Sequence, residues 1–174
     1  MSKHWFRMAS KGFTLIELLV VMGIIGVLAT LIFSNFAGVR ARARDTQRKS
    51  DLNQLKNALR LYYNDYNNYP DDGGDNTIHG CDPSHTSSCE WEGTFTAGST
   101  VYMNQIPQDP LYDADESPTT VYHYNMGTVS DATSTDAFYI TATFENLSDS
   151  AIQDSQTRCG FTPTDETTYV VCSD

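Results

Sequence analysis

The sequence predicts an α+β fold in which a long N-terminal α-helix packs against a small antiparallel β-sheet. Three observations lead to this prediction. A mostly apolar run of 21 residues with a single charge follows a short basic start; leucines and tyrosines then recur at helical spacing; and later segments alternate apolar and polar residues. The chain has 174 residues, and the part that follows the apolar run suits one small globular domain.

The apolar run extends from Phe13 to Phe33, and Glu17 is its only charged residue. About 20 apolar residues are enough to span a bilayer, so we expect a transmembrane helix over residues 13–36. A removable secretory signal has a shorter apolar core and a cleavage site of small residues after it, and this run fits neither feature. A carboxylate in lipid is costly and usually functional, although Glu17 lies close enough to the helix start to reach the headgroups.

A second, amphipathic helical segment is predicted over residues 37–69. Its apolar residues recur at steps of three and four and form one face: Leu52, Leu55, Leu59, Tyr62 and Tyr66. Pro70 and the glycine-containing acidic stretch after it end the helix. We expect this face to lie under the sheet. We also expect the helix to continue from the apolar half as one rod of roughly 80 Å, at 1.5 Å per residue.

Residues 70–174 are predicted to form a globular, β-rich head. Three segments read as strands, with the clearest alternation of apolar and polar residues in the second: 120–126, 136–145 and 168–172. Two further segments, 71–99 and 148–165, are rich in Gly, Ser, Thr and Asp, and we interpret them as surface loops.

The head contains four cysteines: Cys81, Cys89, Cys159 and Cys172. Four cysteines allow three pairings, and local closure favours the first with the second and the third with the fourth. An extracytoplasmic location would permit both bonds. His79 and His85 interleave with the first pair and make a zinc site the competing interpretation, but the spacing fits no standard ligand pattern. We therefore expect disulfides and no metal site.

The segment KGFTLIELLVVMGIIGVL, which starts at Lys11, resembles the leader and helix start of type IV pilins and of the pseudopilins of type II secretion systems. The resemblance is dense up to Phe33 and weaker in the head. It implies a pilin-like fold in which residues 1–12 are a leader that a prepilin peptidase removes after Gly12. The new N-terminal residue, Phe13, would be N-methylated. Glu17 would pair with the new amino group of a neighbouring subunit and set the stagger between subunits.

This resemblance implies a structural subunit of a type IV pilus-like or type II secretion pseudopilus filament, polymerised through its N-terminal helix. The implied partners are copies of the chain, the prepilin peptidase/N-methyltransferase, an assembly ATPase, membrane platform proteins and, before assembly, membrane lipid. The subunit would start as a single-pass inner-membrane protein with an extracytoplasmic head and end in a periplasmic or cell-surface filament. The head favours the pseudopilin type, whereas the loop between the last two cysteines favours a pilin.

An alternative function is a monomeric, membrane-anchored extracytoplasmic binding protein, for which Glu17 would be dispensable. No nucleophile, base and orienting residue form a recognisable motif, so we do not expect an enzyme. His123 is interpreted as a residue on a strand face.

The charge of the chain is distributed unevenly. The formal net charge is −11, and residues 61–174 contain one arginine against nineteen acidic residues, a net charge of −18. Such a surface repels nucleic acid, so no direct nucleic-acid binding is expected.

Five basic residues follow the apolar run: Arg40, Arg42, Arg44, Arg48 and Lys49. They outnumber those before it, which by the positive-inside rule would place the head in the cytoplasm. The leader resemblance favours the opposite orientation, and we expect this basic cluster to pair with acidic heads of neighbouring subunits.

An acidic cluster lies in the middle of the head: Asp109, Asp113, Asp115 and Glu116. Carboxylates of this kind supply the oxygen ligands that calcium prefers, and the resemblance implies calcium in this general part of major pseudopilins. The spacing is not that of an EF-hand, and a solvated acidic loop is the commoner origin of such a cluster. No cofactor is therefore predicted, with calcium as the competing hypothesis.

Overall fold

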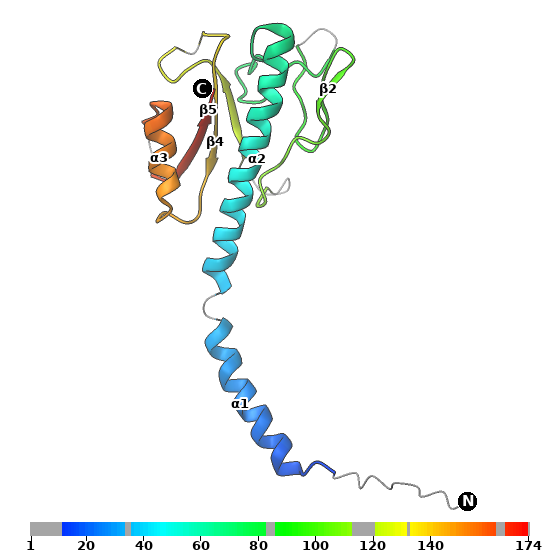
Figure 1. Ribbon diagram of the computed structural model, residues 1–174, viewed down its shortest axis with the longest axis vertical. Helices are drawn as coiled ribbons and strands as arrows, with labels where there is room; N and C mark the ends of the chain where they lie inside the picture. The colour runs from blue at the N-terminus through cyan, green and yellow to red at the C-terminus, as the bar shows by residue number, and fades with distance from the viewer. Residues whose placement is uncertain are drawn as a thin grey trace, which may run out of the picture. The chain divides into compact units, whose positions relative to one another are not determined.

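The computed structural model describes residues 12–33, 36–82, 86–112, 121–131, 133–162 and 166–173 (Figure 1). The chain divides into two compact units, Met1–Val39 and Arg40–Asp174, and each is described by itself. Of the predicted leader, residues 1–12, only Gly12 lies within the described ranges.

The first unit contains helix α1, Leu15–Phe33. Apart from Glu17 and Thr30 its residues are apolar or glycine, so α1 has no polar face of the kind that a surface helix of a globular protein presents to water. Within the described part of the chain, no helix combines the length and the apolar character that crossing a bilayer requires. The predicted transmembrane segment includes residues 34 and 35, which lie outside the described ranges.

Helix α2, Phe36–Tyr66, carries the predicted apolar face. Leu52, Leu55, Leu59 and Tyr62 are buried, which confirms the helical spacing, whereas Tyr66 is 36% exposed. The helix ends where Asn67 adopts a left-handed conformation (φ 55°) and its N–H donates to the carbonyl of Tyr63 over 2.8 Å. The continuous rod expected from the sequence remains a prediction, because the two residues between α1 and α2 are outside the described ranges.

The head contains a three-stranded antiparallel sheet of order β3-β4-β5. Its strands, which lie in the predicted segments, are β3, His123–Met126, β4, Phe138–Thr143, and β5, Thr168–Cys172. Along β4, Phe138, Ile140 and Ala142 are buried, whereas the residues between them are half-buried. This alternation confirms the predicted core face of the strand.

A separate two-stranded hairpin corrects the loop expected over 71–99. Strands β1, Phe95–Ala97, and β2, Thr100–Met103, are joined by a turn in which Gly98 has φ 59°. Phe95 is fully buried and stacks on Tyr62, with ring centroids 5.7 Å apart. The prediction failed because a three-residue strand is too short to show periodicity, and burial of one aromatic ring outweighs the loop-like composition.

The other predicted loop, 148–165, contains helix α3, Ser150–Cys159. Asp149 caps its start by accepting the N–H of Ala151 over 3.0 Å, and Gly160 ends it with φ 62°. Ile152 and Ser155 are buried against the sheet, where the Ser155 hydroxyl accepts the N–H of Val170 over 3.2 Å. The loop prediction was wrong because weak helix formers dominate this segment, although Asp149 and Gly160 are strong helix-capping residues.

One hydrophobic core joins these elements within the second unit. The leucines of α2 lie in the same cluster as the inward residues of β1, β3, β4 and β5. Figure 1 shows the three-stranded sheet between α2 and α3, and the β1–β2 hairpin on the other side of α2. The helix is thus packed between the two β-sheets of the head.

Candidate assembly site and polar sites of the head

Helix α1 begins with a capping box formed by Thr14 and Glu17. The Thr14 hydroxyl oxygen accepts the N–H of Glu17 over 3.3 Å, and Oε2 of Glu17 accepts both the N–H and the hydroxyl of Thr14, each over 2.8 Å. Reciprocal bonds of this kind satisfy donors that a helix N-terminus leaves open. The spacing T-x-x-E was the sequence signal for this box, and our sequence analysis missed it. The Glu17 carboxylate therefore points toward the N-terminal end of α1.

The predicted processing site lies immediately before this box. Gly12, Phe13 and Thr14 precede the helix, the ring of Phe13 is 84% exposed, and a side chain added at Gly12 would meet nothing within 4 Å. Gly12, Phe13 and Thr14 are therefore exposed and non-helical. The processing and assembly roles of these residues remain predictions.

The apolar surface of α1 is uncovered within its unit. Every large apolar side chain from Phe13 to Leu28 is at least 46% exposed. A contiguous apolar surface of this extent marks a site that lipid or another protein covers.

The head neutralises most of the basic cluster internally. Arg48 is fully buried, and it donates to Asp45 (2.7 Å), to Asp109 (2.7 and 3.0 Å) and to Glu145 (2.9 Å). Burial by itself would lower the pKa of Arg48, but the hydrogen bonds to Asp109 and Asp45 outweigh it and raise the pKa. Arg48 therefore remains charged inside the head.

Two further cations bind acids of the same head. Arg44 donates to Glu145 over 2.7 Å, and Lys49 donates to Asp149 over 2.6 Å. The expectation that the whole cluster pairs with neighbouring subunits is therefore wrong for Arg44, Arg48 and Lys49. No sequence pattern indicates these two ion pairs, because Arg44 and Lys49 lie about 100 positions from their partners.

The ion pairs of Arg48 also explain the position of Asp109. Both of its carboxylate oxygens accept from Arg48, and Oδ1 also accepts the N–H of Leu111 over 2.9 Å. Asp109 is therefore a buried partner of Arg48, which corrects its interpretation as a calcium ligand. The other three acids, Asp113, Asp115 and Glu116, lie outside the described residues. Among the positions that the structure does describe, no group of three His, Cys, Asp or Glu could hold a metal ion.

Two disulfides hold the edges of the head. Cys81 is bonded to Cys89 and Cys159 to Cys172, with Cα–Cα distances of 5.2 and 5.8 Å. This is the pairing that local closure favours. The second bond joins the last residue of α3 to the last residue of β5.

The histidine next to the first disulfide is held by other groups. Nδ1 of His79 lies 2.9 Å from the carbonyl of Thr86, and Nε2 lies 3.2 Å from Asp75. The two thiols are consumed by the disulfide, so they offer no thiolate to zinc. His85, the other residue of that hypothesis, is outside the described residues.

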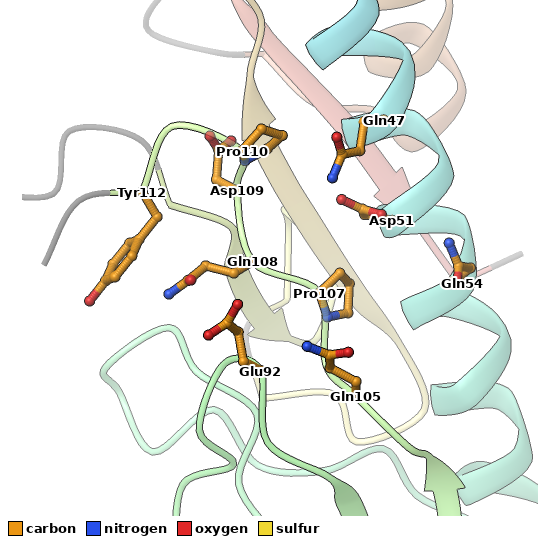
Figure 2. A pocket seen from close by; sticks show the side chains of 10 residues that line it. All are labelled: Gln47, Asp51, Gln54, Glu92, Gln105, Pro107, Gln108, Asp109, Pro110 and Tyr112. Carbon is orange, nitrogen blue, oxygen red and sulfur yellow. The ribbon is translucent and has the colours of Figure 1, made fainter.

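A polar cleft of about 500 Å³ lies between α2 and the segment that follows β2 (Figure 2). Its lining is mostly amides and carboxylates: Gln47, Asp51, Gln54, Glu92, Gln105, Pro107, Gln108, Asp109, Pro110 and Tyr112. Figure 2 shows Gln47, Asp51 and Gln54 on the helix side of the cleft and Glu92 opposite them. No sequence pattern indicates this cleft, because its residues come from three separate segments of the chain.

Asp51 is the most buried carboxylate of this cleft apart from Asp109, with 7% of its surface exposed. Its Oδ2 accepts the hydroxyl of Tyr122 over 2.9 Å. Burial raises the pKa of Asp51, and the hydrogen bond from Tyr122 opposes that shift.

Comparison with known proteins adds evidence on both units. Residues 7–33 match the model of the prokaryotic N-terminal methylation motif. Type II secretion system core protein G of Aeromonas hydrophila is 36% identical over 102 residues, which cover 58% of this chain and 66% of the relative. The chain thus spans slightly less than two thirds of that protein.

Two other relatives support the same comparison. Core protein G of the type II secretion system of Klebsiella pneumoniae is 35% identical over 58% of this chain and 68% of its own length. The type IV major pilin protein PilA of Myxococcus xanthus is 36% identical over 38% of this chain and 30% of its own length. No solved structure matches significantly.

Proposed function

The chain belongs to the family of type II secretion pseudopilins and type IV pilins, and on this premise we propose that it is a structural subunit of an extracytoplasmic filament. The observation that carries the proposal is α1: an apolar helix with exposed side chains on all sides, starting two residues after the predicted cleavage position. In water this surface is unfavourable by roughly 25 cal/mol per Å², so it needs lipid or other copies of the helix. The role is structural and not catalytic.

We propose that a prepilin peptidase/N-methyltransferase cuts after Gly12 and methylates Phe13. An assembly ATPase and membrane platform proteins then move the subunit from the membrane into the filament. The precursor is anchored in the inner membrane with its head outside the cytoplasm, and the product is a periplasmic or cell-surface filament.

The proposed role of Glu17 follows from its capping geometry. Thr14 turns the carboxylate toward the end of the helix at which cleavage would create a new amino group. In an apolar filament core the effective dielectric constant is low, so an unpaired carboxylate is penalised and a paired one selects the register between subunits. We propose that its partner is the amino group of Phe13 in a neighbouring copy.

Of the two filament types, the pseudopilus has the stronger support. The core protein G relatives of Aeromonas hydrophila and Klebsiella pneumoniae each align over 102 residues and so extend into the head, whereas the PilA relative aligns over 66 residues. We therefore propose the secretion pseudopilus as the filament and the surface pilus as the second candidate.

The replacement Glu17→Ala tests this function against the monomeric-anchor alternative. In a host lacking its own copy, we expect the variant to be cleaved after Gly12 but to yield no sheared filaments above background. Asp154→Ala, on exposed α3 surface, is the matched control and should give the wild-type filament yield. Filaments of Glu17→Ala at the wild-type level would support a membrane anchor that does not polymerise.

A further inference from the structure

Two exposed cations of α2, Arg40 and Arg42, form no ion pair among the residues that the structure describes, and Arg42 leaves the helix on the flank opposite the polar cleft. Arg44, Arg48 and Lys49 are each bound to acids of the same head. Arg42 is exposed, and among the described residues it forms no ion pair. Its backbone carbonyl accepts the Thr46 hydroxyl over 2.8 Å, whereas its guanidinium forms no hydrogen bond to the described residues.

The cleft has the complementary chemistry. Its charged lining residues are Asp51, Glu92 and Asp109, and Asp109 is already neutralised by Arg48. Asp51 and Glu92 therefore give the cleft a net negative charge, and four glutamine carbonyls add neutral acceptors. Acceptors of this kind suit a planar guanidinium, which carries five N–H donors.

The cleft is also stable enough to bind a side chain. Glu92 lies in a tight turn with φ 62°, and its N–H donates to the carbonyl of Ile106 over 2.8 Å. Asp51 is held by Tyr122 on the other side. The Asp51 carboxylate is therefore already ordered, and only the exposed side chain of Glu92 has to be ordered when a cation enters.

Arg42 cannot enter the cleft of its own chain. It lies nine residues before Asp51, which is about two and a half turns at 3.6 residues per turn, so the two side chains leave α2 on opposite flanks. A donor on one flank and an acceptor on the other make a heterologous pair of surfaces. Such surfaces join copies head to tail and continue without closing into a dimer.

We propose that the guanidinium of Arg42 in one copy binds in the polar cleft of a second copy, between Asp51 and Glu92. This inference rests on the proposed function and names one lateral contact between heads. A single charge-assisted contact at the surface is weak, and salt weakens it further. Its repetition along a filament raises the total binding free energy between copies.

Charge exchange between Arg42 and Glu92 tests the contact. Arg42→Glu and Glu92→Arg should each lower the yield of sheared filaments roughly tenfold or more, because each places like charges together. The double variant Arg42→Glu/Glu92→Arg should recover most of that loss. Arg158→Glu is the control, since Arg158 is exposed, forms no ion pair among the described residues and lies on α3. It should keep the wild-type yield.

A crosslinking measurement does not depend on how the charge variants fold. In the double variant Arg42→Cys/Glu92→Cys, we expect a bismaleimide linker, which replaces the reach of the two long side chains that a direct disulfide cannot span, to join successive copies into a ladder, and neither single variant should give that ladder. Single charge reversals at the wild-type yield, a double variant no better than the worse single one, or no ladder would each overturn the inference. If Glu17→Ala still abolishes filaments in that case, the proposed function stands and only this contact is wrong.

Discussion

Asp109 binds Arg48 through two hydrogen bonds, Nε to Oδ2 over 2.7 Å and Nη2 to Oδ1 over 3.0 Å, with both side chains buried. This pair joins the middle of α2 to the segment that lines the polar cleft. Asp45 continues the network by accepting Arg48 and the backbone N–H groups of Glu145 and Asn146. One arginine thus fixes both the segment after β2 and the turn after β4 to the helix.

Replacement of Arg48 by Met should lower the free energy of unfolding by about 3–5 kcal/mol, because it leaves buried carboxylates without their cation. The measurement is urea denaturation in detergent micelles of the full chain carrying Trp5→Phe, followed by the fluorescence of Trp91, the one tryptophan that remains. Arg44→Met is the control, since the pair of Arg44 with Glu145 is partly exposed and should contribute less than about 1 kcal/mol. Equal effects of the two changes would show that burial of Arg48 is unimportant.

Loss of the disulfide between Cys159 and Cys172 should lower the free energy of unfolding by roughly 2–4 kcal/mol. The bond closes a loop with a sequence separation of 13 and ties α3 to β5. The double replacement by Ala, measured in the same denaturation experiment, checks this. An unchanged midpoint would mean that the contacts between α3 and the sheet hold this edge without the bond.

Two variants of Asp149, at the start of α3, distinguish its capping bond from its ion pair with Lys49. Asp149→Ala removes the acceptor for Ala151 N–H and the partner of Lys49, so we expect a loss of about 1–2 kcal/mol. Asp149→Asn keeps a capping acceptor and should cost less than about 1 kcal/mol. Thermal unfolding of both variants provides the comparison, and an identical loss in the two would assign the whole effect to the charge.

Acid should destabilise the head through Glu145 and Asp149. The hydrogen bond from Arg44 lowers the pKa of Glu145, and that from Lys49 lowers the pKa of Asp149. As the pH falls, the unfolded chain therefore takes up protons at these two carboxylates before the folded chain does. Their contribution to the free energy of unfolding is present above pH 4.5 and is lost as the pH falls through the lowered pKa values. Asp51, whose pKa is raised by burial, opposes the trend.

The pH dependence can be tested with one variant. Midpoints of urea denaturation measured from pH 6 downward should fall less steeply for Glu145→Gln than for the wild type. Parallel curves would assign the acid sensitivity to other groups.

The fold was predictable from sequence where one residue pattern was long enough. The leucines of α2 and the alternation in β4 each extend over several residues, and burial followed the predicted face in both. Helix α3 and the β1–β2 hairpin were missed because they are short and weak in propensity. Their signals were single residues, Asp149 and Gly160 for the helix and Gly98 for the hairpin.

The polar sites were predictable only where the partners are close in the chain. Glu17 was predicted to be functional because of its charge. Its hydrogen bond to Thr14, three residues away, was also predictable, because this spacing is that of a capping box. The partners of Arg48 come from segments 61 and 97 positions away, and only the tertiary fold brings them together. The same holds for the cleft residues Asp51 and Glu92.

The central claim is that the chain is cut after Gly12 and assembles into a filament outside the cytoplasm. Intact mass and N-terminal sequencing of the protein in a sheared extracytoplasmic fraction test it most directly. The chain should begin at N-methylated Phe13 and be four hydrogen atoms lighter than the reduced form, because it contains two disulfides. A chain that still begins at Met1, found only in membranes with free thiols, would contradict it.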